Sequence, residues 1–182
     1  MDRDLVEAAR HGDREAYADL IRARADRLFA LAQRILRDVD RTEDAVQEAL
    51  VIAWRDLPGL RDPDRFDAWL HRLVVRSCVH EAMRERRLVA NLRVLPLDLP
   101  ATKDDLLSLD DRDQLERGFR RLEPQQRAIL ALRHFAGYEP AEIAEILGIP
   151  GGTVRSRLHH AHRAMRAALE ADARPTAIGG LA

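Results

Sequence analysis

The chain has 182 residues, of which 46% are hydrophobic and 34% charged, and its net charge is −1 at pH 7. This length suits one large domain or two small ones, and the near-neutral charge excludes a uniformly basic nucleic-acid coat. Its one cysteine, Cys78, excludes an internal disulfide, and no apolar run approaches the ~20 residues of a membrane-spanning helix. The N-terminus is charged and shows no signal-peptide pattern, so we expect a cytoplasmic protein.

Helical periodicity covers most of the chain and alternating strand patterns are absent, so we predict an all-α fold. The first helix is expected over residues 4–11 and the second from its cap at Asp13 to Asp38. Thr42 is expected to cap a third helix over residues 42–57, whose core face is Val46, Ala49, Leu50 and Ala53.

The outer face of the third helix combines charged, amide and aliphatic side chains: Asp44, Gln47, Glu48, Val51, Ile52 and Arg55. It is either an ordinary solvated face or a surface that docks a partner, and the residues alone do not decide between them. Asp44 and Glu48 have the i, i+4 spacing of half a carboxylate metal site. No Glu-x-x-His motif completes such a site, so we expect no metal.

A long helix is expected from Phe66, after a turn-rich loop over residues 57–65. Its predicted inner side carries Phe66, Trp69, Leu70, Leu73 and Ser77. The other side carries Arg72, Arg76, Val79 and Met83, and Arg84, Arg86 and Arg87 lie at its end. Basic side chains there suit either the helix dipole or a nucleic-acid backbone.

Residues 91–109 have lost helical periodicity, and six aspartates lie between Asp98 and Asp113. We interpret this segment as a flexible, solvated acidic linker between two domains. It offers little apolar surface, so we expect the two halves to move independently when the protein is free.

A short helix is expected around residues 115–122, and another starts at Pro124 with Ile129, Leu132 and Phe135 inward. Pro140 suits the first position of a further helix that ends at Gly148, and Thr153 is expected to cap the last long helix. Two helices joined by a tight glycine-containing turn are typical of a helix-turn-helix, although an ordinary helical hairpin is the simpler interpretation.

The last helix carries no acidic residue between positions 151 and 169. Val154, Leu158, Ala161 and Met165 share one side, and Ser156, His159, His160 and Arg163 point the opposite way, flanked by Arg155 and Arg157. An exposed basic face on the second helix favours insertion into the major groove of DNA.

Four segments resemble bacterial sigma factors. EIAEILGIPGGTVRSRLHHAHRAM resembles their C-terminal helix-turn-helix, and LEPQQRAILALR resembles the helix that opens that domain. EDAVQEALVIAWR resembles the segment that binds the clamp helices of RNA polymerase, and FDAWLHRLVVRS resembles the segment that melts and reads the downstream promoter element. With no extra N-terminal region and no middle domain, the layout looks like the extracytoplasmic-function (ECF) sigma factors.

The resemblance implies three sets of site residues. Upstream-element binding falls on Thr153, Arg155, Ser156, Arg157, His159, His160 and Arg163. Binding of the melted element falls on Arg65, Trp69, Arg72, Arg76, His80, Arg84, Arg86 and Arg87. Polymerase binding falls on Asp44, Gln47, Glu48, Val51 and Arg55. Where many members have asparagine and aspartate, this chain has Arg76 and His80, which leaves its base preference open.

The same resemblance implies a polymerase- and promoter-binding domain over residues 1–90, a linker over 91–110, a helix-turn-helix domain over 111–172 and a tail over 173–182. Expected partners are core RNA polymerase, duplex and single-stranded promoter DNA, and an anti-sigma protein. We expect no catalytic centre, cofactor, small-molecule substrate or membrane insertion. A DNA-binding regulator that never contacts polymerase and a helical protein-interaction adaptor are the alternatives.

Overall fold

The computed structural model describes residues 2–92 and 117–173, including the side chains of residues 3–85 and 117–171. Within these ranges every regular element is helical, which confirms the all-α expectation. The N-terminal domain contains α1 (Asp2–Arg10), α2 (Arg14–Arg22), α3 (Ala25–Leu36), α4 (Val39–Asp56), η1 (Leu57–Gly59), η2 (Pro63–Arg65) and α5 (Phe66–Leu92). The C-terminal domain contains α7 (Pro124–Leu130), η3 (Ala131–Phe135), α8 (Pro140–Leu147) and α9 (Gly151–Ala173).

Helices α3, α4 and α5 pack against one another and form the centre of the N-terminal domain. Three of the four predicted core positions of α4 are buried, since Val46, Ala49 and Ala53 are each at most 1% exposed, and the fourth, Leu50, is half-buried. Asp13 caps α2 as expected, since its carboxylate accepts hydrogen bonds from the N–H groups of Glu15 and Ala16. The domain is therefore assembled from amphipathic helices whose apolar stripes meet.

The single second helix that we expected over residues 13–38 is wrong, because the chain breaks into α2 and α3 at Ala23–Arg24. Neither glycine nor proline marks this break. Arg24 instead donates a hydrogen bond to the carbonyl of Leu20, pairs with Asp67 and lies over the Phe66 ring at 5.2 Å. Contacts with the distant α5 thus accompany the break, which local periodicity does not reveal.

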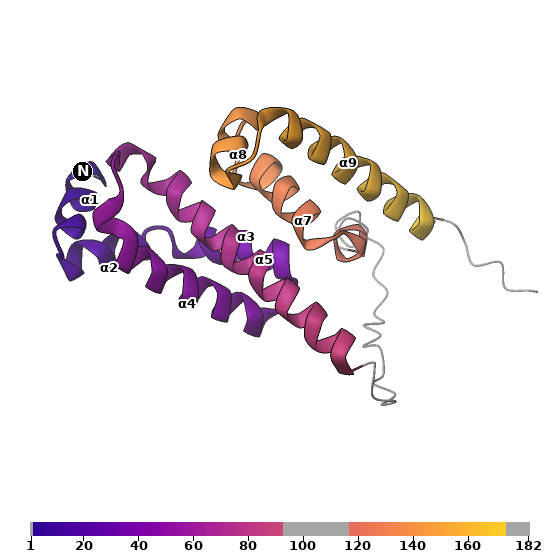
Figure 1. Ribbon diagram of the computed structural model, residues 1–182, viewed down its shortest axis with the longest axis horizontal. Coiled ribbons are helices and arrows are strands. Elements are labelled where there is room, and N and C mark those ends of the chain that lie inside the picture. The colour runs from indigo at the N-terminus through magenta and orange to yellow at the C-terminus, as the bar shows by residue number, and fades with distance from the viewer. Residues whose placement is uncertain (1, 93–116, 174–182) are drawn as a thin grey trace, which may run out of the picture.

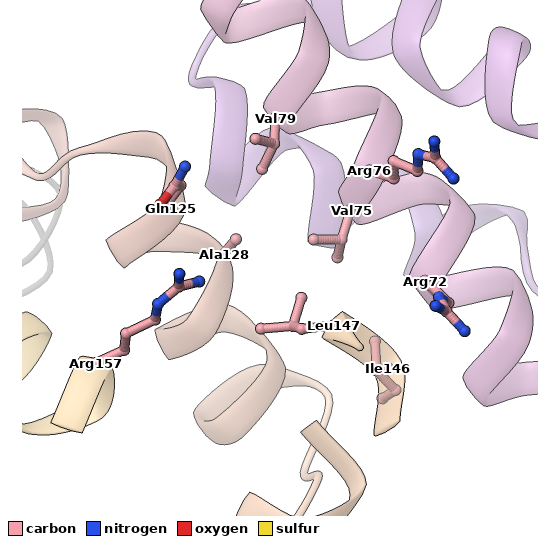
Figure 2. A pocket seen from close by; sticks show the side chains of 9 residues that line it. All are labelled: Arg72, Val75, Arg76, Val79, Gln125, Ala128, Ile146, Leu147 and Arg157. Atoms are coloured by element: carbon pink, nitrogen blue, oxygen red, sulfur yellow. The ribbon is translucent and has the colours of Figure 1, made fainter. Parts of the chain in front are cut away.

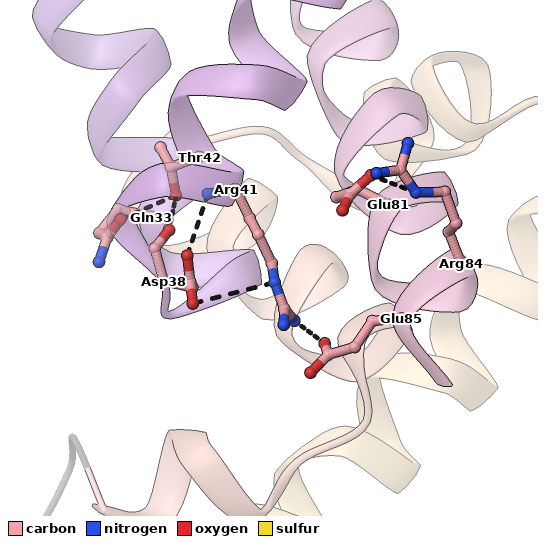
Figure 3. Close-up of polar contacts among 7 residues, drawn as sticks. All are labelled: Gln33, Asp38, Arg41, Thr42, Glu81, Arg84 and Glu85. Atoms are coloured by element: carbon pink, nitrogen blue, oxygen red, sulfur yellow. Dashed lines mark hydrogen bonds and ion pairs between the residues drawn. The ribbon is translucent and has the colours of Figure 1, made fainter. Parts of the chain in front are cut away.

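The start of α4 also differs from the expectation, because Asp38 and not Thr42 is the N-cap (Figure 3). The Asp38 carboxylate accepts a hydrogen bond from Arg41 N at 3.0 Å. Thr42 is 2% exposed, and its hydroxyl lies 2.7 Å from the carbonyl of Asp38 and 2.8 Å from Oε1 of Gln33. Arg41 pairs with Glu85, which joins the start of α4 to the later turns of α5.

In the C-terminal domain, residues 117–121 form a short helix that precedes α7. The segment η3 is a turn of π-helix, in which Ala136 N donates to the carbonyl of Ala131, five residues earlier. Ile129 and Leu132 are buried as expected, but Phe135 is 39% exposed. Our prediction that the Phe135 side chain points inward is therefore wrong. The Arg34 guanidinium lies over its ring at 3.8 Å.

The two domains are packed together: α7, η3 and α8 contact α3 and α5, so the C-terminal helices lie along one side of the N-terminal group (Figure 1). This arrangement differs from the independent halves that we inferred from the linker, because the helices supply the contact themselves. The expected linker and tail fall almost wholly outside the described residues. No described helix is both long and apolar enough to cross a membrane.

Candidate polymerase and nucleic-acid interfaces

The turn between α8 and α9 has the geometry of a helix-turn-helix. Pro140 is the first residue of α8, and Glu139 and Glu142 form a capping box at its start. Gly148 ends the helix in the left-handed conformation at φ 65°, as we predicted. Val154 N donates to the carbonyl of Pro150 at 3.1 Å, which closes the first turn of α9.

Thr153 is not the helix cap, because α9 already begins at Gly151 and Thr153 lies within its first turn, half-buried. The hydroxyl of Ser156 donates to the carbonyl of Thr153 at 3.0 Å. Ser156 therefore keeps an oxygen lone pair available as an acceptor, while its proton is used within the helix.

The other predicted residues of α9 lie on the sides of the helix where we expected them. Val154, Leu158 and Ala161 are buried at 0%, 8% and 0% exposure. The opposite side is exposed along its length: Arg155, Ser156, Arg157, His159, His160 and Arg163. Helix α9 therefore presents a cationic and imidazole-rich face to solvent while its other face is fixed in the core.

His162 makes a contact that the sequence did not suggest. Its Nε2 lies 2.9 Å from Nε2 of His134, which belongs to η3. Burial lowers the pKa of His134, and the neighbouring His162 and Arg133 lower it further. This contact joins α9 to η3, while His159 and His160 are also exposed on α9.

Four of the predicted polymerase-binding residues on the outer face of α4 are exposed: Asp44, Gln47, Glu48 and Val51. Val51 is 66% exposed, which is high for a branched apolar side chain next to charged neighbours. The last predicted residue, Arg55, donates to both carboxylate oxygens of Asp56 at 2.8 and 3.3 Å, and this pairing lowers the Asp56 pKa. A partner that binds Arg55 must therefore compete with Asp56.

Helix α5 brings several predicted strand-binding residues to one surface. Arg72, Arg76, His80 and Arg84 are all exposed. Trp69 is half-buried, with its ring centroid 5.9 Å from that of Phe66, so it belongs largely to the packing of the helix. Arg84 pairs with Glu81 at 3.5 Å. The side chains of Arg86 and Arg87 lie outside the described residues.

Arg65, at the end of η2, pairs with Glu145 of α8 at 2.8 Å. On α5, His71 Nδ1 lies 2.7 Å from the hydroxyl of Tyr138, and the two rings meet edge to face at 5.5 Å. Burial lowers the pKa of His71 and raises that of Tyr138 to about 12. The sequence did not suggest this contact, since 67 residues separate His71 and Tyr138.

A cavity of about 330 Å³ lies between the two domains (Figure 2). Its α5 wall carries Arg72, Val75, Arg76 and Val79, and the other wall comes from α7, α8 and α9. Arg157 of α9 is one of the lining residues, so the cavity is lined by side chains from both predicted DNA-binding helices.

Cys78 is completely buried, and burial raises its pKa to about 12. The thiol is therefore a small apolar core group, as opposed to a reactive sensor. Among the described side chains, no group of three or more histidine, cysteine, aspartate or glutamate residues could hold a metal ion.

Two family models match the chain: Sigma-70 region 2 over residues 20–88 and Sigma-70, region 4 over residues 112–165. The chain is also 33% identical over 156 residues to the ECF RNA polymerase sigma factor SigM of Mycobacterium tuberculosis H37Rv, covering 86% of this chain and 78% of the relative. The chain belongs to the ECF sigma factors. As a sigma factor, it binds core RNA polymerase and directs promoter recognition and strand opening.

This sigma factor is 34% identical to the RNA polymerase sigma-E factor of Streptomyces avermitilis, over 88% of each chain. Its fold is similar to that of CnrH in complex with the cytosolic domain of CnrY, with a TM-score of 0.66, 25% identity, and 94% and 99% of the two chains covered. It is also similar in fold to RpoE of Bartonella quintana in complex with the anti-sigma factor NepR, with a TM-score of 0.65, 24% identity, and 86% and 98% covered.

Proposed function

We propose that this ECF sigma factor divides its work among three surfaces, each on a different helix. The exposed side of α9 binds the upstream promoter element as duplex DNA, α5 binds the melted downstream strand, and the outer face of α4 binds core RNA polymerase. The observation that carries the proposal is the arrangement of α9, whose apolar side is buried and whose acid-free side is open to solvent.

On α9, Arg155, Arg157 and Arg163 supply charge for phosphates or bidentate contacts to guanine. Ser156, His159 and His160 are at the centre of the exposed side and are the base-edge readers in this scheme. Thr153 contributes from the first turn of the helix, where free N–H groups favour a phosphate.

On α5, the combination of exposed arginines with an adjoining apolar ring suits a single strand. Bases that are flipped out of a duplex stack on aromatic or apolar side chains while basic residues follow the backbone. Arg65, Arg72, Arg76 and Arg84 supply the charge, and the exposed edge of Trp69 supplies stacking surface. His80, one turn beyond Arg76, sets part of the base preference.

The α4 surface is unsuited to phosphate, because Asp44 and Glu48 would repel it. Exposed Val51 at its centre, surrounded by polar groups, has the composition of a protein-binding surface with an apolar centre and a polar rim. We therefore assign Asp44, Gln47, Glu48, Val51 and Arg55 to polymerase binding.

The chain supplies binding free energy to initiation, and polymerase performs the chemistry, so we propose no enzymatic activity and a cytoplasmic location. The RpoE structure with a similar fold contains an anti-sigma factor, and we propose a protein inhibitor of the same kind here.

The test is run-off transcription with purified core polymerase, with and without this protein, followed by mapping of the start sites. We expect protein-dependent transcripts from a restricted promoter set. Glu48→Arg should abolish them through loss of polymerase binding, and Arg163→Ala should weaken them while binding to polymerase is retained. The proposal fails if wild-type protein yields no specific start sites, or if both variants transcribe normally.

A further inference from the structure

Two histidines from different elements of the C-terminal domain meet on its surface. His134 belongs to η3 and His162 to α9, and their Nε2 atoms lie 2.9 Å apart with the ring planes at 66°. Both side chains are exposed, so their nitrogens can be reached from solvent. Neither histidine belongs to the three surfaces that we assign to polymerase and promoter DNA.

The separation of the two nitrogens matches that of neighbouring ligands on one metal ion. At the metal–nitrogen distance of about 2.0–2.1 Å known for zinc, two nitrogens stand about 2.9 Å apart at a right angle and about 3.3 Å apart at the tetrahedral angle. The right angle is that of the square-planar or tetragonal sites that Cu(II) and Ni(II) prefer. Rotation of the exposed rings about their Cβ–Cγ bonds directs both nitrogen lone pairs at a shared ion.

The backbone beneath each histidine is held in place by the core of the domain. His162 follows Ala161, which is fully buried, and His134 lies two residues after Leu132, which is also fully buried. His134 is part of the π-helical turn, and such turns are frequent at functional sites. Ligands on a fixed backbone favour binding because little conformational freedom is lost when the ion arrives.

The surroundings of the pair allow a cation to bind. Arg133 lies next to His134, but its guanidinium is paired with Glu139 at 2.7 Å, which offsets part of its repulsion of a second cation. Cys78 is the one cysteine and is fully buried, so its thiol does not compete for the ion. Since the described side chains hold no group of three metal-binding residues, the other coordination positions are left to water or a ligand from solvent.

We propose that His134 and His162 form a two-histidine site for a divalent late transition-metal ion, Cu(II) or Ni(II), which joins η3 to α9. An ion that binds only the folded domain stabilises it by an amount that grows with the metal concentration. A domain with a small core is sensitive to such a link. The stability of the helix-turn-helix domain therefore responds to the concentration of these ions.

The experiment is isothermal titration calorimetry of the full-length protein, without a histidine tag, with CuCl2, NiCl2 or MgCl2. The site variants are His134→Gln and His162→Gln, and the control is His11→Gln, which removes an exposed imidazole from the N-terminal domain. Wild type and the control should bind one ion per chain, Cu(II) more tightly than Ni(II), and should not bind Mg(II).

Each site variant should bind Cu(II) at least 10-fold more weakly, because removing a residue that only orients a metal ligand already costs about 10- to 100-fold. The variant that lacks both histidines should be little weaker than either single variant, because a two-ligand site is lost with its first ligand. Two independent sites would instead bind two ions per chain and lose them one at a time, which would contradict the proposal.

Spectroscopy and thermal unfolding give readouts besides affinity. The electron paramagnetic resonance spectrum of Cu(II) bound to wild type should show coupling to two nitrogens, and that coupling should be lost in both site variants. The melting temperature should rise with added NiCl2 in wild type and His11→Gln and stay unchanged in both site variants. Circular dichroism verifies that each variant is folded.

The proposal is overturned if wild type binds neither ion, if either site variant binds as tightly as wild type, or if His11→Gln loses as much affinity as they do. His159→Gln tests another pairing, because positions 159 and 162 are neighbours on the surface of α9. Retained binding in His159→Gln supports the pairing of His134 with His162. Loss of binding there, with normal binding in His134→Gln, places the ion on α9 alone and overturns the assignment.

Discussion

Replacing Arg155 and Arg163 with alanine should flatten the salt dependence of duplex binding while leaving the fold intact. Both side chains are exposed on α9, and neither is paired with a carboxylate of the described residues. Each neutralised phosphate contributes about 0.9 to the slope of log affinity against log salt, so losing two lowers the slope by about 1.8. Between about 50 and 200 mM salt, the variant should therefore lose about 12-fold less affinity than wild type.

The assay is fluorescence anisotropy of a labelled promoter duplex, titrated at several salt concentrations with the double variant, wild type and Arg14→Ala. Arg14 is an exposed arginine at the start of α2, in the other domain, and its removal should leave the slope unchanged. An unchanged slope in the double variant would refute the assignment of α9 as the DNA-binding helix. An equal fall in Arg14→Ala would show that net charge, and not the position on α9, controls binding.

Glu48→Arg should abolish co-purification with core polymerase because it reverses the charge of the α4 face, and normal retention on core would contradict that role. Burial raises the Cys78 pKa to about 12, so iodoacetamide at pH 8 should alkylate it about 10³-fold more slowly than a free thiol. Fast labelling of the native protein, without urea, would show that Cys78 is accessible. Burial lowers the His71 pKa, partly opposed by Asp67, so the unfolded state binds more protons as the pH falls below about 6.5. The free energy of unfolding should therefore be highest above about pH 6.5 and fall towards pH 5. His71→Gln should reduce that fall, measured as the urea midpoint at each pH. An identical pH dependence in wild type and variant would contradict this prediction.

Local chemistry accounts for the elements that the sequence predicted well. Backbone preferences alone predict the roles of Pro140 and Gly148, which lie at the start and the end of α8 as expected. The buried side of α9 follows from 3.6-residue spacing, because Val154, Leu158 and Ala161 need only an apolar neighbour to be buried.

The misplaced elements depend on distant contacts. Asp38 and Thr42 are both good cap residues. The choice between them involves Gln33, whose side-chain oxygen accepts a hydrogen bond from the buried Thr42 hydroxyl. The break at Arg24 involves Asp67, 43 residues away. The sequence did not predict the packing of the two domains for the same reason, since the linker composition carries no information about which helix surfaces meet.

The π-helical turn of η3 makes the position of α8 depend on the number of residues that precede it. An α-helix advances about 100° per residue, so deleting one residue from 131–135 would restore ordinary α-helical bonding and rotate the following chain by about that angle. Tyr138 would then turn away from His71, and Glu145 away from Arg65, although every side chain was retained. The spacing between α7 and α8 is thus as much a determinant of the interface as the residues within it, and an alignment gap at this turn would mark relatives with a different domain arrangement.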